Sequence, residues 1–85
     1  MKVKILFFAA LREQLGRSQE EIELPAGTHT VDSLRNHLRA RGGAYEKVFS
    51  GKSLVRAAVN QEMAQAGAPI KAGDEVAFFP PVTGG

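Results

Sequence analysis

The residues best placed to do chemistry stand at the end of the sequence, which closes on Gly84 and Gly85. Neither glycine has a Cβ, so this backbone can enter a channel that any larger residue would block. Pro80 and Pro81 end the preceding strand, because neither donates a ladder hydrogen bond, and they favour an extended path afterwards. At ~3.1 Å per residue, residues 80–85 would reach about 19 Å from the body. We therefore predict that the Gly85 carboxylate is a reactive group on a slender arm. The alternative is a frayed end, where glycines often collect.

Other chemistry finds little support in the sequence. There is no cysteine, and neither His29 nor His37 stands at metal-ligand spacing from an acidic residue or from the other histidine. The segment Gly51-Lys52-Ser53 ends like a phosphate-binding loop, but Glu46 occupies the place of that motif's first glycine. A self-contained enzyme, a metal site and bound ATP are therefore not expected.

The elements that must position the arm form one small domain, residues 1–85, with the tail at 80–85. Alternating apolar residues predict strands, Thr30 is a suitable N-cap for the main helix, and Gly42-Gly43 ends that helix. Several strands and one substantial helix favour an α+β fold, the ubiquitin-like β-grasp, in which a mixed sheet carries the helix on one face. The predicted strands are 2–8, 19–24, 54–59, 62–64 and 75–79, with short helical turns at 9–15 and 44–49.

The first and last predicted strands are neighbours in a β-grasp, so their residues fall on two shared faces. We expect one face to pack against the helix through Val3, Ile5, Phe7, Val76 and Phe78. The other face would carry Leu6, Phe8, Ala77 and Phe79 as one apolar patch beside the exit of the tail. A patch of this kind favours a partner surface. The alternative is a second small core, with loops folded over the patch.

Composition and charge suggest an ordinary globular domain. Hydrophobic residues make up 44% and charged residues 24%, and the net charge is +2. No apolar run is long enough to cross a bilayer, and with no cysteine and no export signal we expect a cytoplasmic protein without membrane contact. A basic segment, residues 35–56, raises the alternative of a non-carrier interaction module that binds nucleic acid or an acidic partner. Against nucleic acid, its cations are not interleaved with aromatics as a base-stacking platform requires. These cations are Arg35, Arg39, Arg41, Lys47, Lys52 and Arg56.

Three segments carry a resemblance that extends over essentially the whole chain. They are residues 73–85 (GDEVAFFPPVTGG), residues 57–61 (AAVNQ), and residues 6–9 (LFFA) with Arg12-Glu13. The first is highly specific. With these motifs the sequence resembles the family of molybdopterin synthase small subunits, the sulfur carriers of molybdenum-cofactor biosynthesis. Residues 40–56 are the least distinctive stretch, and the resemblance assigns no functional residue to them.

The resemblance implies a carrier that binds no cofactor and is not an enzyme on its own. In the family, an activating enzyme of the ubiquitin-activating type uses ATP to adenylate the terminal carboxylate, here that of Gly85. A sulfur donor then replaces AMP and leaves a thiocarboxylate. The loaded tail enters the large synthase subunit, which supplies the catalytic side chains, and sulfur passes to cyclic pyranopterin monophosphate to form the molybdopterin dithiolene. Family members assemble as a heterotetramer.

The site residues follow from the same resemblance. Gly85 would be the adenylation and thiocarboxylate site, and the tail that threads into the partner would comprise Gly84, Thr83, Val82, Pro81 and Pro80. The residues expected to contact the partner are Phe8, Phe79, Leu6, Ala77 and Arg12. A sulfur carrier of another pathway, such as thiamine biosynthesis, would share Gly84-Gly85 and the activation chemistry.

Overall fold

The computed structural model describes residues 1–50 and 55–80. The predicted order of elements is confirmed, with small shifts at the ends: the first strand stops at Phe7, and the turn at 44–49 is a helix that begins at Gly43. The elements are β1 (Lys2–Phe7), α1 (Ala10–Leu15), β2 (Gln19–Glu23), α2 (Val31–Arg39), α3 (Gly43–Val48), β3 (Arg56–Val59), β4 (Glu62–Ala64) and β5 (Glu75–Phe79).

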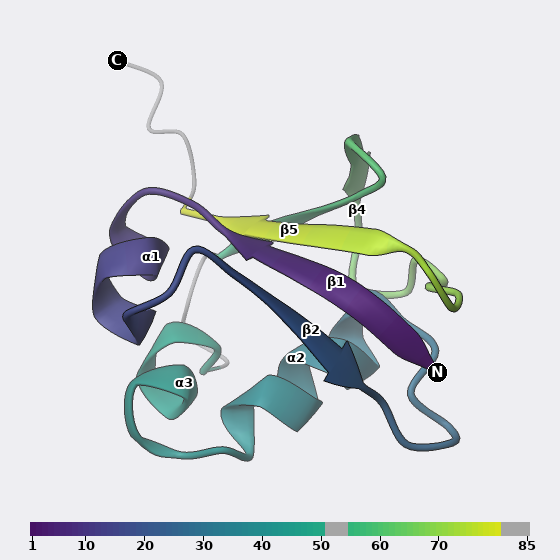
Figure 1. Cartoon of the computed structure of the whole chain (residues 1–85), viewed down its shortest axis with the longest axis horizontal. Coiled ribbons are helices and arrows are strands. Elements are labelled where there is room, and N and C mark those ends of the chain that lie inside the picture. The colour runs from purple at the N-terminus through teal and green to yellow at the C-terminus, as the bar shows by residue number, and fades with distance from the viewer. Residues whose placement is uncertain (51–54, 81–85) are drawn as a thin grey trace.

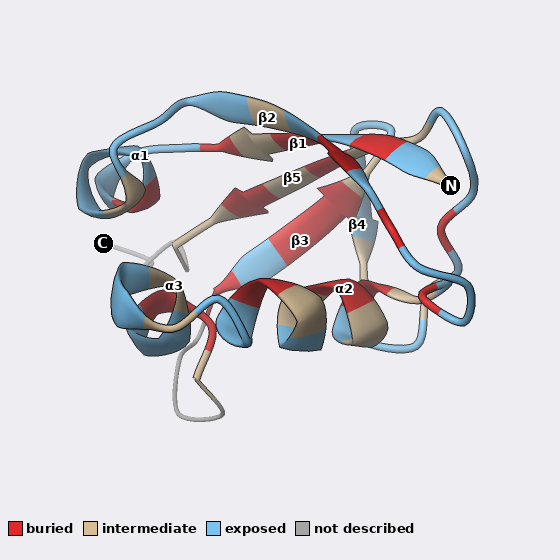
Figure 2. Ribbon diagram, turned by 60° about the horizontal axis from the view of Figure 1, so that its bottom comes forward, coloured by how far each residue is buried: buried red, intermediate tan, exposed pale blue. Residues whose placement is uncertain are grey.

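The strands form a five-stranded mixed sheet in the order β2-β1-β5-β3-β4 (Figure 1). The first and last strands are parallel neighbours at its centre, and every other pairing is antiparallel. Figure 2 shows α2 and α3 lying along one side of the sheet, with α1 at the end where β1 stops. This arrangement is the predicted α+β fold, the ubiquitin-like β-grasp.

The core lies between the sheet and these helices, and the alternation of the strands creates it. Ile5 and Val76 are register partners on the central strands, and both are fully buried. The rings of Phe7, Phe49 and Phe78 pack against one another, and the closest pair, Phe49 and Phe78, stand edge to face at 4.9 Å between centroids. The expected helix-facing set is therefore confirmed: Val3, Ile5, Phe7, Val76 and Phe78 are each at most 1% exposed.

The main helix, α2, begins as predicted. Thr30 is extended, and its Oγ1 accepts a hydrogen bond of 3.1 Å from the Ser33 amide, which satisfies one of the free donors of the first turn. Val31, Leu34 and Leu38 then fall on one stripe and are buried against the sheet.

An ion pair that the sequence pattern did not indicate holds β2 to the segment between α2 and α3. Arg41 donates to both carboxylate oxygens of Glu20, at 2.9 and 2.8 Å, and its guanidinium lies 5.0 Å from the centre of the Tyr45 ring. This hydrogen-bonded guanidinium lowers the pKa of the Glu20 carboxyl below its usual 4.5. A charge in the basic segment thus serves a structural purpose.

Candidate functional site

The face of the sheet opposite α2 and α3 carries a row of apolar residues. The strand registers place Leu6 beside Ala77, Ala77 beside Ala58, and Ala58 beside Met63. Register partners project on the same side of a sheet, so these four side chains form a line from β1 to β4. Met63 is 62% exposed, which leaves one end of this line open to solvent.

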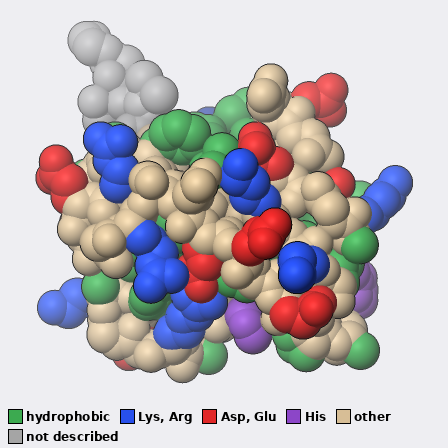
Figure 3. All heavy atoms as spheres, in the orientation of Figure 1, with side chains coloured by type: hydrophobic (Ala, Val, Ile, Leu, Met, Phe, Trp, Pro, Cys, Tyr) green, Lys and Arg blue, Asp and Glu red, His purple; other side chains and the backbone are tan. Residues whose placement is uncertain are grey.

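Two aromatic residues complete the surface at the end of the central strands. Phe79 is the last residue of β5 and is half-buried, whereas Phe78 is fully buried. Phe8 follows β1 and is 47% exposed, and its amide donates to the Phe78 carbonyl at 3.1 Å, which continues the parallel pairing by one residue. Figure 3 shows hydrophobic side chains gathered at the top of the view, above β5. We call Leu6, Phe8, Ala58, Met63, Ala77 and Phe79 the apolar patch. Ala58 is its most buried member, at 8% exposure.

The predicted patch of Leu6, Phe8, Ala77 and Phe79 is therefore brought together by the fold. None of the four belongs to the buried core: Phe8 is exposed, and the other three are half-buried. The sequence reasoning missed Ala58 and Met63. Their signal was the two-residue turn at Asn60-Gln61, since a tight hairpin of known register places Met63 opposite Ala58.

A tight turn at Ala9 sets the position of Phe8. Ala9 has φ 54° and ψ −131°, a backbone conformation that L side chains rarely adopt, and the Leu11 amide closes the turn on the Phe8 carbonyl at 3.1 Å. The chain thereby reverses from β1 into α1. Arg12, another predicted contact residue, is exposed on that helix.

The predicted tail is described only at its first residue. β5 ends at Phe79, as the two prolines require, and Pro80 follows half-buried, directly after the apolar patch. Pro81, Val82, Thr83, Gly84 and Gly85 lie outside the described residues. The roles assigned to them thus remain predictions.

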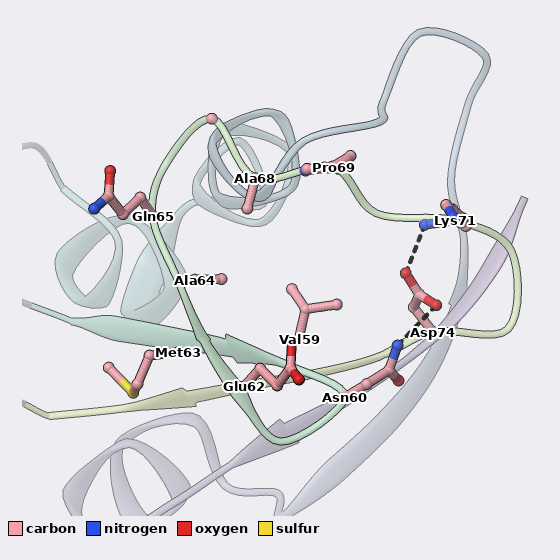
Figure 4. Close-up of a pocket in the computed structure, with 11 residues that line it drawn as sticks. Val59, Asn60, Glu62, Met63, Ala64, Gln65, Ala68, Pro69, Lys71 and Asp74 are labelled. Atoms are coloured by element: carbon pink, nitrogen blue, oxygen red, sulfur yellow. Dashed lines mark hydrogen bonds between the residues drawn. The ribbon is translucent and has the colours of Figure 1, made fainter.

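A second feature lies at the start of β5. A hollow of about 560 Å³ separates the β3–β4 hairpin from the loop before β5, and Val59, Ala64 and Pro69 are among the residues that line it (Figure 4). Asp74 closes one side: its Oδ1 accepts from the Asn60 side chain at 3.0 Å, and its Oδ2 accepts from the Lys71 amide at 2.8 Å. Both carboxylate oxygens are thereby occupied, so Asp74 fixes the turn into β5.

The structure also bears on a metal site, a membrane span and the basic segment. Within residues 1–50 and 55–80, no three His, Asp or Glu side chains are grouped as a metal site requires. Across the same ranges, no helix is long and apolar enough to cross a membrane. In the basic segment, Arg35 is half-buried and donates to the Val55 carbonyl at 2.9 Å, and Arg41 pairs with Glu20. Both guanidinium groups are thus engaged within the protein, whereas Arg39 and Lys47 are exposed.

Comparison with known proteins agrees with this geometry. The model of the ThiS family matches residues 5–85. The molybdopterin synthase sulfur carrier subunit of Escherichia coli is 43% identical over 83 residues, which cover 98% of this chain and 99% of that protein. The subunit of the same name from Haemophilus influenzae is 40% identical, with 98% and 99% covered. Among solved structures, a putative molybdopterin converting factor subunit 1 from Pyrococcus furiosus superposes with a TM-score of 0.77 at 36% identity, covering 96% of this chain and 99% of that one.

Proposed function

The chain belongs to the ThiS family, and from that premise we propose that it is the sulfur carrier subunit of molybdopterin synthase. The observation that carries the proposal is the position of the apolar patch. The central strand β5 delivers the chain to Pro80 at the edge of this patch, beside the exposed Phe8. A partner that covers the patch therefore receives the residues that follow Pro80.

The reacting group in this proposal is the carboxylate of Gly85. A carboxylate is a poor electrophile, so an activating enzyme first joins one of its oxygens to the α-phosphorus of ATP, and pyrophosphate leaves. A sulfur donor then attacks the acyl carbon of this mixed anhydride, and AMP leaves with the bridging oxygen. The product is a thiocarboxylate, whose sulfur is nucleophilic at neutral pH. The two terminal glycines add no side chain, so the end can reach into an enclosed site.

Delivery of sulfur requires the large subunit as the partner. The patch residues Leu6, Phe8, Ala77 and Phe79 would form the contact surface, with Arg12 beside it. Residues 80–84 would thread the thiocarboxylate to the bound precursor, cyclic pyranopterin monophosphate. Two such transfers make one dithiolene. In this proposal the chain binds the large subunit and delivers sulfur to it, and the large subunit supplies the side chains that bind substrate and catalyse. Two small and two large subunits form a heterotetramer.

Intact mass spectrometry tests the proposal directly. After incubation with the activating enzyme, ATP and a sulfur source, the protein should gain ~16 Da, the exchange of one oxygen for sulfur, and fragment spectra should place the gain on Gly85. Sulfur on a side chain instead, or no gain in mass, would contradict the proposal.

Three variants of the end test the geometry. Deleting Gly85, or appending one residue after it, displaces the reacting carboxyl by ~3.3 Å, so both changes should abolish sulfur transfer. Gly85→Ala keeps the carboxylate but adds a Cβ, so it should slow activation or transfer. Melting temperatures should be the same for all three, since the apolar core comprises residues up to Phe78. Full activity of the extended chain, shown by mass to be unprocessed, would exclude a carrier role.

The thiamine-pathway alternative is decided by the sulfur-transfer assay. The curated relatives at 43% and 40% identity carry the molybdopterin synthase name, which favours that pathway. A loaded chain that converts the pyranopterin precursor together with the large subunit confirms it. A loaded chain that does not would assign the sulfur to another acceptor.

A further inference from the structure

The open face of the sheet has two halves with different charge balance. In the half away from the tail, Lys4 stands between its register partners Glu21 on β2 and Glu75 on β5. Lys2 likewise faces Glu23, whose carboxylate also pairs with the chain's amino terminus at 2.7 Å. Cations and anions alternate here, so this half largely compensates its own charge.

In the half that carries the apolar patch, Arg56 has no acidic register partner among the described residues, and α1 adds Arg12, which Glu13 follows in sequence. Arg56, the first residue of β3, is the register partner of Phe79 and is exposed on the same face of the sheet. Arg12 is exposed on α1, the helix that follows Phe8. Within the described part of the chain neither guanidinium has an ion-pair or hydrogen-bond partner, whereas Arg41 and Arg17 pair with Glu20.

We propose that Arg56 selects the partner: the surface that covers the apolar patch carries an acidic side chain at its rim, opposite Arg56. This inference rests on the proposed function, because it describes the large subunit that would bind there. Arg56 is suited to this role by position, since it borders the patch next to the residue from which the tail departs. It is suited by chemistry as well, because a guanidinium binds a carboxylate with two parallel hydrogen bonds.

Because Arg56 lies at the rim of the apolar patch, replacing it should change the association rate more than the dissociation rate. A charge at the edge of an interface stays partly hydrated, so it acts mainly on the rate of association and on its salt dependence. The patch itself supplies apolar burial, which acts mainly on dissociation. At ~0.15 M salt the Debye length is about 8 Å, so a cation beside the patch still attracts an approaching carboxylate, whereas at ~1 M salt, with about 3 Å, it does so weakly.

The test measures association of the full chain with the purified cognate large subunit by stopped-flow, over a series of salt concentrations. Arg56→Gln should lower the association rate constant about two- to fivefold at low salt and flatten its dependence on ionic strength. Arg56→Glu should lower it further. The matched control is Arg39→Gln, which removes the same charge from the exposed end of α2 on the helical side. This control should associate like the unmodified chain, and all variants should converge near 1 M salt.

Each outcome decides one of the two proposals. If Arg56→Gln and Arg39→Gln behave alike, net charge and not the position of Arg56 governs association, and the inference is wrong. If Arg56→Gln associates faster, the rim of the partner is basic and the inference is reversed. If the unmodified chain does not bind the large subunit at all, the proposed function fails. Circular dichroism of all three variants should match the parent, because Arg56 and Arg39 are exposed.

Discussion

Adjacent residues in the last strand have opposite roles. Phe78 is fully buried and its ring packs against Phe7 and Phe49, whereas Phe79 is half-buried on the open face. The two side chains differ only in the side of the sheet to which the pleat directs them. One stabilises the domain, and the other is available to a partner.

Truncating each phenylalanine should therefore give two distinct results. Phe79→Ala should leave the fold intact and weaken binding of the large subunit by about 2 kcal/mol, since large aromatic anchors dominate interfaces. Phe78→Ala should instead destabilise the domain by about 3–5 kcal/mol, because it leaves a cavity in the core. Urea unfolding and calorimetric titration on both variants would check this. Unfolding by Phe79→Ala, with unchanged affinity in the folded fraction, would mean that the faces are reversed.

Ala9 has a backbone conformation that is unfavourable for an alanine. Its φ of 54° with ψ −131° suits glycine, so Ala9→Gly should stabilise the domain by about 1 kcal/mol. The same change one residue later, Ala10→Gly, falls in helical backbone and should destabilise by about 0.5–1 kcal/mol. Denaturant unfolding of the pair measures both signs. Equal destabilisation by the two changes would contradict a strained turn at Ala9.

At this scale the sequence predicted the faces of residues but not their local strain. Alternation in β1 and β5 assigned Leu6, Ala77 and Phe79 to the open face, because a period of two is visible in any strand of five or six residues. The positive φ of Ala9 left no such signal, since alanine is an ordinary helix former. The partner of Met63 depended on the hairpin register, which three residues of strand are too short to reveal by periodicity.

Among the elements, β2 depends on a contact remote in sequence. The Glu20 carboxylate on β2 binds both donors of Arg41, which follows α2, so the pair ties the edge strand to the helical layer. Neither residue belongs to an apolar period. The sequence pattern therefore does not indicate this pair, and it predicts Arg41 only as a cation of the basic segment, residues 35–56.

This pair should make stability depend on pH. The pKa of Glu20 is lowered below 4.5 in the folded protein, chiefly by the hydrogen bonds from Arg41, so the folded state binds fewer protons than the unfolded state. The stabilisation is therefore present above pH 4.5 and is lost as pH falls through the folded pKa. Arg41→Gln should lower stability at neutral pH and reduce the further loss between about pH 5 and pH 3. Arg39→Gln should keep the parent pH profile in thermal melts, and a parent-like profile for Arg41→Gln would contradict the role of the pair.

The element order itself was readable because its signals were local. Thr30, Gly16 and the prolines after β5 mark boundaries by local chemistry, and the structure confirms the three boundaries. The helix α3 was underestimated as a turn, since Gly42-Gly43 is typical of an end and not of a start. Gly42 has φ 78° and is the N-cap of α3, and Gly43 is the first residue of that helix. The glycine pair therefore ends the connection from α2 and begins α3.

Over the whole molecule, stability should be highest at the centre of the sheet. β1 and β5 are flanked on both sides by other strands, and their inward residues are the most deeply buried. The short β4 is an edge strand with an exposed Met63. We expect the slowest amide hydrogen exchange at Ile5 and Val76 and much faster exchange in β4, measured by NMR at neutral pH. Protection of β4 equal to that of β1 would mean that the sheet opens only as one unit.

The parallel pairing of β1 with β5 also bears on how the protein is made. The ribosome synthesises β1 first and β5 last of the eight elements, so the central pair joins segments that are far apart in time. Until β5 emerges, Ile5 and Phe7 have no strand on that side and no Phe78 to cover them. A nascent chain halted before Glu75 should thus expose an apolar strand edge and recruit a chaperone that recognises hydrophobic segments. The parallel pairing that ends β5 beside the apolar patch therefore also delays the moment at which the edge of β1 is covered.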